Sequence, residues 1–170
     1  LYISSGTWSL MGTELEEANC SPESRAANFT NEGGYNDRFR YLKNIMGLWV
    51  LNEAVRTWHD QGMKIALPEA DAAAADAEPL RTVVDINDAS FYSPGDMAAR
   101  IDEAAHATGQ PCPRDIGEYI RCINDSLALA YRRAVRQAVE LSGREVKVLH
   151  IVGGGIRNRL LCQLAADATG

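Results

Sequence analysis

The sequence predicts one domain of the α/β or α+β class, built from layers of strands and helices. Three observations favour this class. Extended segments dominate the first thirty residues, segments with helical periodicity fill the middle of the chain, and a strand, a glycine turn and a helix follow one another at its end. Elements in this order bury their apolar faces by stacking in layers. With 170 residues, 46% of them hydrophobic, the chain is long enough for one core.

Charge and composition argue against several kinds of partner. The net charge is −6 and no dense stripe of Lys and Arg is present, so we expect no binding to nucleic acid. No apolar run approaches the ~20 residues that span a bilayer, and no signal peptide is recognisable, so we expect a cytoplasmic protein without a membrane partner. The cysteines form no C-x-x-C pair and the three histidines are scattered along the chain, which predicts buried free thiols and no metal site.

The first fifteen residues predict a β-hairpin. An extended run leads into the small-residue turn Ser4-Ser5-Gly6-Thr7, and a second extended run covers Trp8 to Met11. A further short strand is expected over residues 27–30, before Gly33 and Gly34. Because the chain starts with Leu1 inside a predicted strand, and not with Met, we expect it to be part of a longer protein.

The middle of the chain predicts four helical segments and one strand. Apolar residues at intervals of three and four indicate a helix over 41–58. Alanine and acidic residues predict a surface helix or a loose connection over 68–79, and a strand is expected over 82–86. Ser93 as N-cap, Pro94 and Asp96 indicate the start of a helix that Gly109 ends. Asp115 with Glu118 forms a second capping pattern, which opens a long helix closed by Gly143.

The end of the chain carries a glycine turn suited to an anion. A strand over 147–152 leads into Gly153-Gly154-Gly155, and a helix follows from Ile156. Unpaired N–H groups and the positive end of a helix dipole gather at such a turn, and glycine lets a ligand reach the main chain. The pattern matches neither the dinucleotide fingerprint, because Asn158 stands where a third small residue belongs, nor a P-loop. Tight packing is the alternative explanation for these glycines.

The hairpin turn is a second candidate phosphate site. Main-chain N–H groups and hydroxyls of residues 4–7 can bind phosphate oxygens without a helix. Two such turns at opposite ends of one domain suggest a cleft that holds one nucleotide between them.

Five segments together resemble a known family. "SSGTWSLMG", "NFTNEGG", "RYLKNIMGLWVL", "RCINDSLALAYR" and "LHIVGGGIRNRLLCQLAADATG" are similar, in this order and from end to end, to the C-terminal half of FGGY carbohydrate kinases. These kinases belong to the actin, hexokinase and Hsp70 superfamily. The resemblance implies a ribonuclease-H-like α/β domain with a mixed sheet flanked by helices. It also implies that residues 1–170 form most of the C-terminal, nucleotide-binding domain, without the N-terminal sugar-binding domain and the extreme C-terminus.

The resemblance also implies roles for particular residues. Gly6 and Thr7 would belong to the second phosphate loop, with Thr7 near the β- and γ-phosphates of ATP. Gly153, Gly154, Gly155 and Asn158 would form the adenosine motif. Asn44 and Asn52 fall on family positions that contact the nucleotide. On the predicted helix 41–58 they would share one side, about 12 Å apart along the axis. The alternative is that both are solvated polar residues, especially Asn52, because relatives often carry Gln there.

The implied reaction needs more than this chain contains. The family transfers the γ-phosphoryl group of ATP, with Mg²⁺, to a sugar hydroxyl, and the similarity within the family implies the 1-hydroxyl of L-rhamnulose. The general base, an Asp, would lie upstream of Leu1, so no residue of this chain is expected to be catalytic and none to bind metal. The N-terminal kinase domain would be the partner in cis. A kinase for another ketose or pentulose, or a non-catalytic nucleotide-binding module, are the alternatives.

Overall fold

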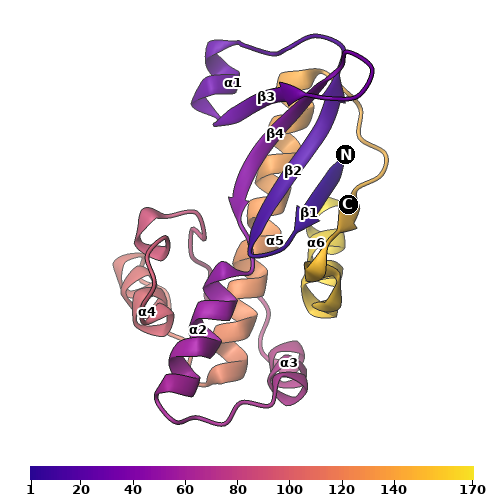
Figure 1. Cartoon of the computed structure of the whole chain (residues 1–170). Coiled ribbons are helices and arrows are strands. Elements are labelled where there is room, and N and C mark those ends of the chain that lie inside the picture. Colours follow the sequence, from indigo (N-terminus) through magenta and orange to yellow (C-terminus); the bar gives the residue numbers. More distant parts are fainter.

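The computed structural model describes residues 1–170, apart from the side chain of Leu67. Two short 3-10 turns, Ala89–Phe91 and Gly154–Arg157, accompany the main elements. These elements follow one another along the chain (Figure 1) as β1 (Tyr2–Ser5), β2 (Trp8–Leu15), α1 (Pro22–Ala26), β3 (Phe29–Gly33), β4 (Phe39–Met46), α2 (Trp49–Asp60), α3 (Leu67–Asp76), α4 (Met97–Ala107), α5 (Ile116–Ser142), β5 (His150–Val152) and α6 (Arg159–Thr169).

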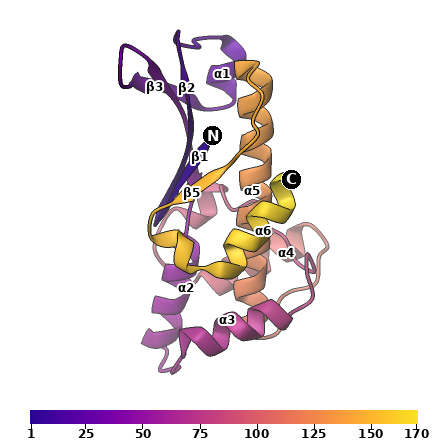
Figure 2. The ribbon, with the colours of Figure 1, turned by 90° about the vertical axis from the view of Figure 1, so that its right-hand side faces the viewer.

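The strands form one mixed sheet with the order β3-β4-β2-β1-β5. All neighbours are antiparallel except β1 and β5, which are parallel. The long helix α5 and the last helix α6 lie on the same side of this sheet (Figure 2). The predicted α/β class with a mixed sheet and flanking helices is therefore confirmed.

Side-chain alternation gives the sheet two different faces. Ser5 and Ser9 contact Tyr131 of α5, so their face of β1 and β2 is buried. On the opposite face one row crosses the sheet through residues in register, because Val152 lies opposite Ser4, Ser4 opposite Leu10 and Leu10 opposite Asn44. Directly opposite residues point to the same side. Apart from half-buried Leu10, the members of this row are exposed, so the sheet is open to solvent along this row.

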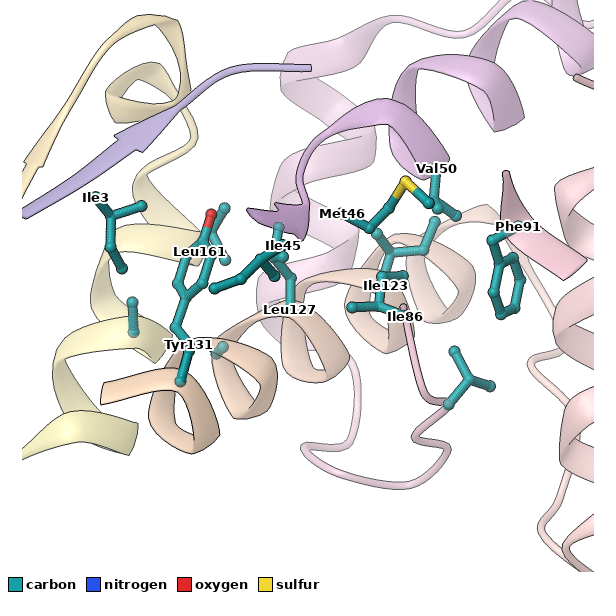
Figure 3. Packing of buried hydrophobic residues seen from close by; sticks show 14 of the residues in the cluster. Ile3, Ile45, Met46, Val50, Ile86, Phe91, Ile123, Leu127, Tyr131 and Leu161 are labelled. Carbon is teal, nitrogen blue, oxygen red and sulfur yellow. The ribbon is translucent and has the colours of Figure 1, made fainter. Parts of the chain in front are cut away.

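Helix α5 is the longest element and carries the core. Asp115 caps its start by accepting a hydrogen bond from the N–H of Glu118, and Gly143, with φ of 65°, ends it in the left-handed conformation. At 1.5 Å per residue the helix is about 40 Å long, so it reaches both the sheet and the helices α2, α3 and α4 beyond it. Its Ile123 and Leu127 belong to one core cluster with apolar residues from the strands, α2 and the loop before α4 (Figure 3), among them Ile3, Ile45, Val50, Ile86 and Phe91.

The predicted helix over 41–58 is wrong in its first half. Residues Phe39–Met46 form β4, which pairs with β2 over its whole length, and the helix α2 begins only at Trp49. Both faces of β4 bury apolar residues near its end, since Leu42, Ile45 and Met46 are all buried. Burial on both faces of a strand produces the spacing of three and four that indicates a helix.

The predicted strand over 82–86 is also wrong. Thr82, Val84 and Ile86 are buried in alternation, as in a strand. Their main chain, however, bonds to side chains and not to a neighbouring strand. The N–H of Val84 donates to Ser126 Oγ, and the side chain of Gln110 binds both the N–H and the carbonyl of Val83. The alternating burial of residues 82–86 therefore does not mark a strand, because side chains supply the hydrogen bonds of the main chain that a neighbouring strand would otherwise supply.

Several boundaries also differ from the prediction. Helix α4 is capped by Asp96 and not by Ser93, because Oδ1 of Asp96 accepts a hydrogen bond from the N–H of Ala99. The carbonyls of Ser93 and Pro94 accept hydrogen bonds from Arg100. The strand expected over 27–30 exists as β3, two residues later. The helix expected over 68–79 is α3, and its buried Ala70 and Ala74 belong to the core. The hairpin is confirmed, with its turn reduced to Gly6 and Thr7.

The four cysteines are free, as predicted, but only Cys122 is buried. Burial raises the pKa of the Cys122 thiol to about 12, which keeps it protonated and unreactive. Within the described part of the chain, no helix has both the length and the apolar character to cross a bilayer.

A buried carboxylate joins α2 to the loop before α4. Glu53 is only 4% exposed, and it accepts hydrogen bonds from the guanidinium of Arg56 and from the N–H of Gly95. The guanidinium of Arg56 lowers the pKa of Glu53 from 4.5 to about 2, although burial alone would raise it. The ionised form is therefore stabilised by folding.

The pKa of Glu53 predicts an acid-sensitive contribution to stability. Because the folded pKa lies below the unfolded one, this contribution is complete above pH 4.5 and is lost as the pH falls towards 2. We expect Glu53→Gln to lower the free energy of unfolding by about 1–3 kcal/mol at pH 7. Thermal unfolding from pH 7 to pH 2.5 should show this difference narrowing below pH 4.5. A difference that stays constant over the range would contradict the assignment.

Candidate functional site

The turn between β1 and β2 is fixed to the start of α2. The N–H of Leu48 donates to the carbonyl of Gly6, and the N–H of Trp49 donates to the carbonyl of Thr7, both at 2.9 Å. These bonds occupy two N–H groups that a helix start otherwise leaves free. They also turn both carbonyl oxygens of the turn towards the helix. The N–H of Gly6 in turn donates to the carbonyl of Trp8 at 3.0 Å, so this N–H is also bonded within the fold.

Gly47 makes this contact possible. A Cβ at this position would lie 2.6 Å from the carbonyl oxygen of Gly6 and 2.7 Å from the carbonyl carbon of Trp8. Only glycine lets the main chain approach so closely. This role of Gly47 was not predicted, because the residue lies inside the helix expected over 41–58. A glycine between two apolar runs was the signal available.

The three glycines of the second turn have different roles. Gly153 has φ of 92°, and a Cβ there would lie 2.5 Å from the carbonyl oxygen of Ser5. Gly155 is buried, and a Cβ there would overlap the hydroxyl and Cβ of Ser5. Gly154 is exposed, and nothing lies within 4 Å of where its Cβ would be. Two glycines are therefore required by packing, and the middle one borders open space.

The two turns lie side by side. β1 and β5 are parallel neighbours, with Ser4 opposite Val152, so the strands end next to each other. Ser5 is the common point, because it immediately precedes the turn Gly6–Thr7 and packs against Gly153 and Gly155. The expectation that the two turns converge is confirmed, and their joint binding of a nucleotide stays a prediction.

Asn158 has its side chain committed to structure. Its Oδ1 accepts a hydrogen bond from the N–H of Leu161 and so caps α6, and its Nδ2 donates to Oδ1 of Asn124, each at 2.9 Å. Asn158 therefore fixes the end of the glycine turn. A direct contact with a ligand would have to use the second proton on Nδ2.

Asn44 and Asn52 do not share a helix. Asn44 lies on β4 and Asn52 lies one turn into α2, and both are exposed. Asn44 shares a row of the sheet with Val152, the residue before the glycine turn, at a separation of three strand spacings or about 14 Å. The expected geometry, in which one side of a helix offers both amides, is wrong, and contact of either residue with a nucleotide stays a prediction.

A cavity of about 290 Å³ opens beside Asn44, at the edge of β4 that β3 leaves uncovered. Trp8 and Tyr92 line it as an edge-to-face pair with ring centres 6.1 Å apart, and Trp8 is 51% exposed. Lys43 and Arg133 also line it. Burial and the charge of Arg133 together lower the pKa of Lys43. The cavity is thus lined by two aromatic rings and two basic side chains, of which Lys43 donates to the carbonyl of Ala27.

The described residues do not gather a cluster of three or more His, Cys, Asp or Glu side chains that could hold a metal ion.

Comparison with known proteins identifies the family. The family model described as the C-terminal domain of the FGGY family of carbohydrate kinases matches residues 1–170. The chain therefore belongs to the FGGY family of carbohydrate kinases.

Its curated relatives include rhamnulokinases. The chain is 44% identical over 169 residues to those of Bacteroides thetaiotaomicron, Enterobacter sp. (strain 638) and Klebsiella pneumoniae. Each alignment covers 99% of this chain and 34% of the relative. The chain thus spans about a third of the length of the curated relatives it matches.

Solved structures share the fold. The xylulose kinase from Rhodospirillum rubrum aligns with a TM-score of 0.70 and 15% identity over 99% of this chain and 33% of its own. The xylulose kinase from Bifidobacterium adolescentis aligns with a TM-score of 0.63 and 15% identity over 96% of this chain and 31% of its own. The ribonuclease-H-like fold implied by the sequence is thus found in kinases of low sequence identity.

The different surroundings of Gly154 and Gly155 predict opposite tolerance to a methyl group. Gly155→Ala should lower the free energy of unfolding by about 1–3 kcal/mol, because the new Cβ overlaps Ser5. Gly154→Ala should change it by less than about 0.5 kcal/mol. Denaturant unfolding measures both. Combining Gly155→Ala with Ser5→Gly should recover part of the loss, and strict additivity of the two changes would contradict the proposed overlap.

Proposed function

We propose that this chain is the ATP-binding part of a kinase that transfers the γ-phosphoryl group of ATP to the 1-hydroxyl of L-rhamnulose, giving L-rhamnulose 1-phosphate. The observation that carries the proposal is the open space at Gly154 beside the turn Gly6–Thr7, where two main-chain bends meet around Ser5. Bends of this kind present N–H groups without side chains in the way, which is what phosphates and a ribose need.

Each part of the site has a defined task in this proposal. The turn Gly6–Thr7 binds the β- and γ-phosphates through Thr7, because the N–H of Gly6 and the N–H groups of Leu48 and Trp49 are already bonded within the fold. The glycine turn holds the adenosine, with Gly154 against it and Gly153 and Gly155 keeping the bend in place against Ser5. Asn44 and Asn52, both exposed, offer amides along the same site. Asn158 acts mainly by fixing the bend.

Catalysis by this chain consists of positioning and charge neutralisation. Phosphoryl transfer gains most of its rate from holding the γ-phosphate in line with the acceptor. Mg²⁺ would arrive with the phosphates of ATP and supply positive charge there, since the described residues hold no acidic cluster for it. The Asp that takes the proton of the sugar hydroxyl, and the sugar pocket, would belong to an N-terminal domain of the intact enzyme.

L-Rhamnulose is favoured over other sugars by sequence similarity. The three relatives at 44% identity are named rhamnulokinase, whereas the xylulose kinases are only 15% identical and share the fold. A kinase for another ketose or pentulose is the alternative, because sugar contacts would come largely from outside this chain.

ATP binding tests the nucleotide site directly. Titration of ATP with Mg²⁺, followed through the fluorescence of Trp8 and Trp49 beside the turn, should give weak, saturable binding to the chain. Gly154→Val should weaken it at least about tenfold, or about 1.4 kcal/mol, because the new side chain fills the space intended for the nucleotide. The unfolding temperature should stay unchanged, since the side chain meets open space.

Gly33→Val is the matched control. Gly33 ends β3, away from both turns, and also has nothing within 4 Å of a Cβ. This variant should bind ATP like the unaltered chain. Equal binding by the Gly154→Val variant would show that the turn has only a structural role.

The chain alone should not catalyse the reaction. Without an aspartate base and a sugar pocket, it should release no ADP above the background hydrolysis of ATP when L-rhamnulose is added. A coupled assay of ADP formation, with and without the sugar, measures this. Sugar-dependent ADP release by the purified 170-residue chain would contradict the division of roles described above.

A further inference from the structure

We infer that Tyr131 and Asn124 of α5 are positioning residues, which hold the two turns of the proposed nucleotide site in one fixed arrangement. The inference rests on the proposed ATP-binding function, since the turns are the ones assigned to ATP there. Neither side chain would touch ATP. Each acts through a residue next to one turn.

Tyr131 holds the turn between β1 and β2. Its side chain is fully buried, and its hydroxyl lies 2.6 Å from Oγ of Ser9 and 3.4 Å from Oγ of Ser5. These serines stand on either side of the turn Gly6–Thr7. Burial raises the pKa of Tyr131, so its hydroxyl stays protonated and can donate one bond and accept another. Figure 3 shows Tyr131 rising from α5 beside Ile3 of β1.

Asn124 holds the end of the glycine turn. It is fully buried, and its Oδ1 accepts the hydrogen bond from Nδ2 of Asn158. The orientation of both amides follows from Leu161, because its N–H needs Oδ1 of Asn158 as an acceptor. Nδ2 of Asn158 therefore faces Asn124, which must present its oxygen. Nδ2 of Asn124 is left buried without a hydrogen-bond partner.

The spacing of the two residues lets one rigid helix serve both turns. Asn124 and Tyr131 are seven residues apart, which is two helical turns, so they lie on the same side of α5 about 10 Å apart. Ser5 connects the two contacts, because its hydroxyl approaches Tyr131 while the same side chain packs against Gly155. A shift of either turn would thus disturb both.

Nδ2 of Asn124, which is buried without a hydrogen-bond partner, makes it possible to distinguish a positioning role of this residue from a stabilising one. A buried N–H without an acceptor lowers stability, whereas an apolar side chain of similar volume at the same place does not. Asn124→Leu removes this donor, and water can reach Nδ2 of half-buried Asn158. If Asn124 served stability alone, its replacement would lower both the unfolding temperature and the affinity for ATP. If Asn124 is a positioning residue, its replacement by Leu should lower the affinity for ATP without lowering the unfolding temperature.

The experiment compares three variants of the full 170-residue chain. Asn124→Leu and Tyr131→Phe each remove one of the contacts. Tyr119→Phe is the matched control, because its hydroxyl is on the same helix but donates to Asp102, on α4. Three quantities are measured for each: the unfolding temperature, the hydrogen exchange of peptides covering residues 4–8 and 153–158, and the Kd for ATP with Mg²⁺.

Each variant has a distinct expected result. Asn124→Leu should leave the unfolding temperature unchanged or higher, while exchange over 153–158 and the Kd for ATP each rise about tenfold, the effect of one hydrogen bond. Tyr131→Phe should raise exchange over 4–8 and also weaken ATP binding about tenfold, with some loss of stability. Tyr119→Phe should change neither turn.

The outcomes separate this inference from the proposed function. Failure of the unaltered chain to bind ATP would overturn the proposed function, and the inference with it. ATP binding that is as tight in the Asn124→Leu and Tyr131→Phe variants as in the unaltered chain would overturn the inference alone. A fall in the unfolding temperature of Asn124→Leu that accounts for its whole loss of binding would show a structural role and would also overturn it.

Discussion

The structure depends on one close contact, in which the end of β1 lies inside the bend of the glycine turn. The main chain of the glycine turn lies directly against Ser5 there, because a Cβ at Gly153 would meet the carbonyl oxygen of Ser5 and a Cβ at Gly155 would meet its side chain. The parallel pairing of β1 with β5 brings the two segments together, and Gly47 produces a similar close approach on the other side of the hairpin turn. The turn Gly6–Thr7 lies between these two contacts, so main chain borders it on both sides. In the proposed function, a turn held in this way would bind phosphate without a charged side chain.

The division of roles among the glycines explains how such a turn can be both rigid and open. Gly153 and Gly155 give rigidity, and Gly154, which borders empty space, gives access. The FGGY family to which the chain belongs shares this fold with kinases of very low sequence identity. A site made mostly of main chain is compatible with that divergence, since packing around the bend limits only a few side chains. Sugar specificity can then vary elsewhere without altering the nucleotide turns.

The sequence predicted those elements whose signals are local. The hairpin, the capped helix α5 with its terminal Gly143, and the last strand, turn and helix follow from neighbouring residues and were confirmed. The failures arose where tertiary packing decides. β4 buries both faces and so imitates a helix, and the main chain around Val84 finds its hydrogen-bond partners on side chains. The two turns of the site were found from their composition, but which glycine is open depends on Ser5, far away in sequence. Asn124 and Tyr131 carry no motif, so only the three-dimensional structure reveals them.

The pairing of β1 with β5 also has a consequence for the order of folding. Strands β1, β2 and β4 are close in sequence and can assemble early, and α5 can form from its own caps. The contact between Ser4 and Val152, however, joins almost the two ends of the chain, so it requires the closure of a very long loop. Contacts of such high sequence separation form slowly. The two turns of the proposed nucleotide site therefore come together late, after the rest of the domain has collapsed, and they remain apart in partly folded forms.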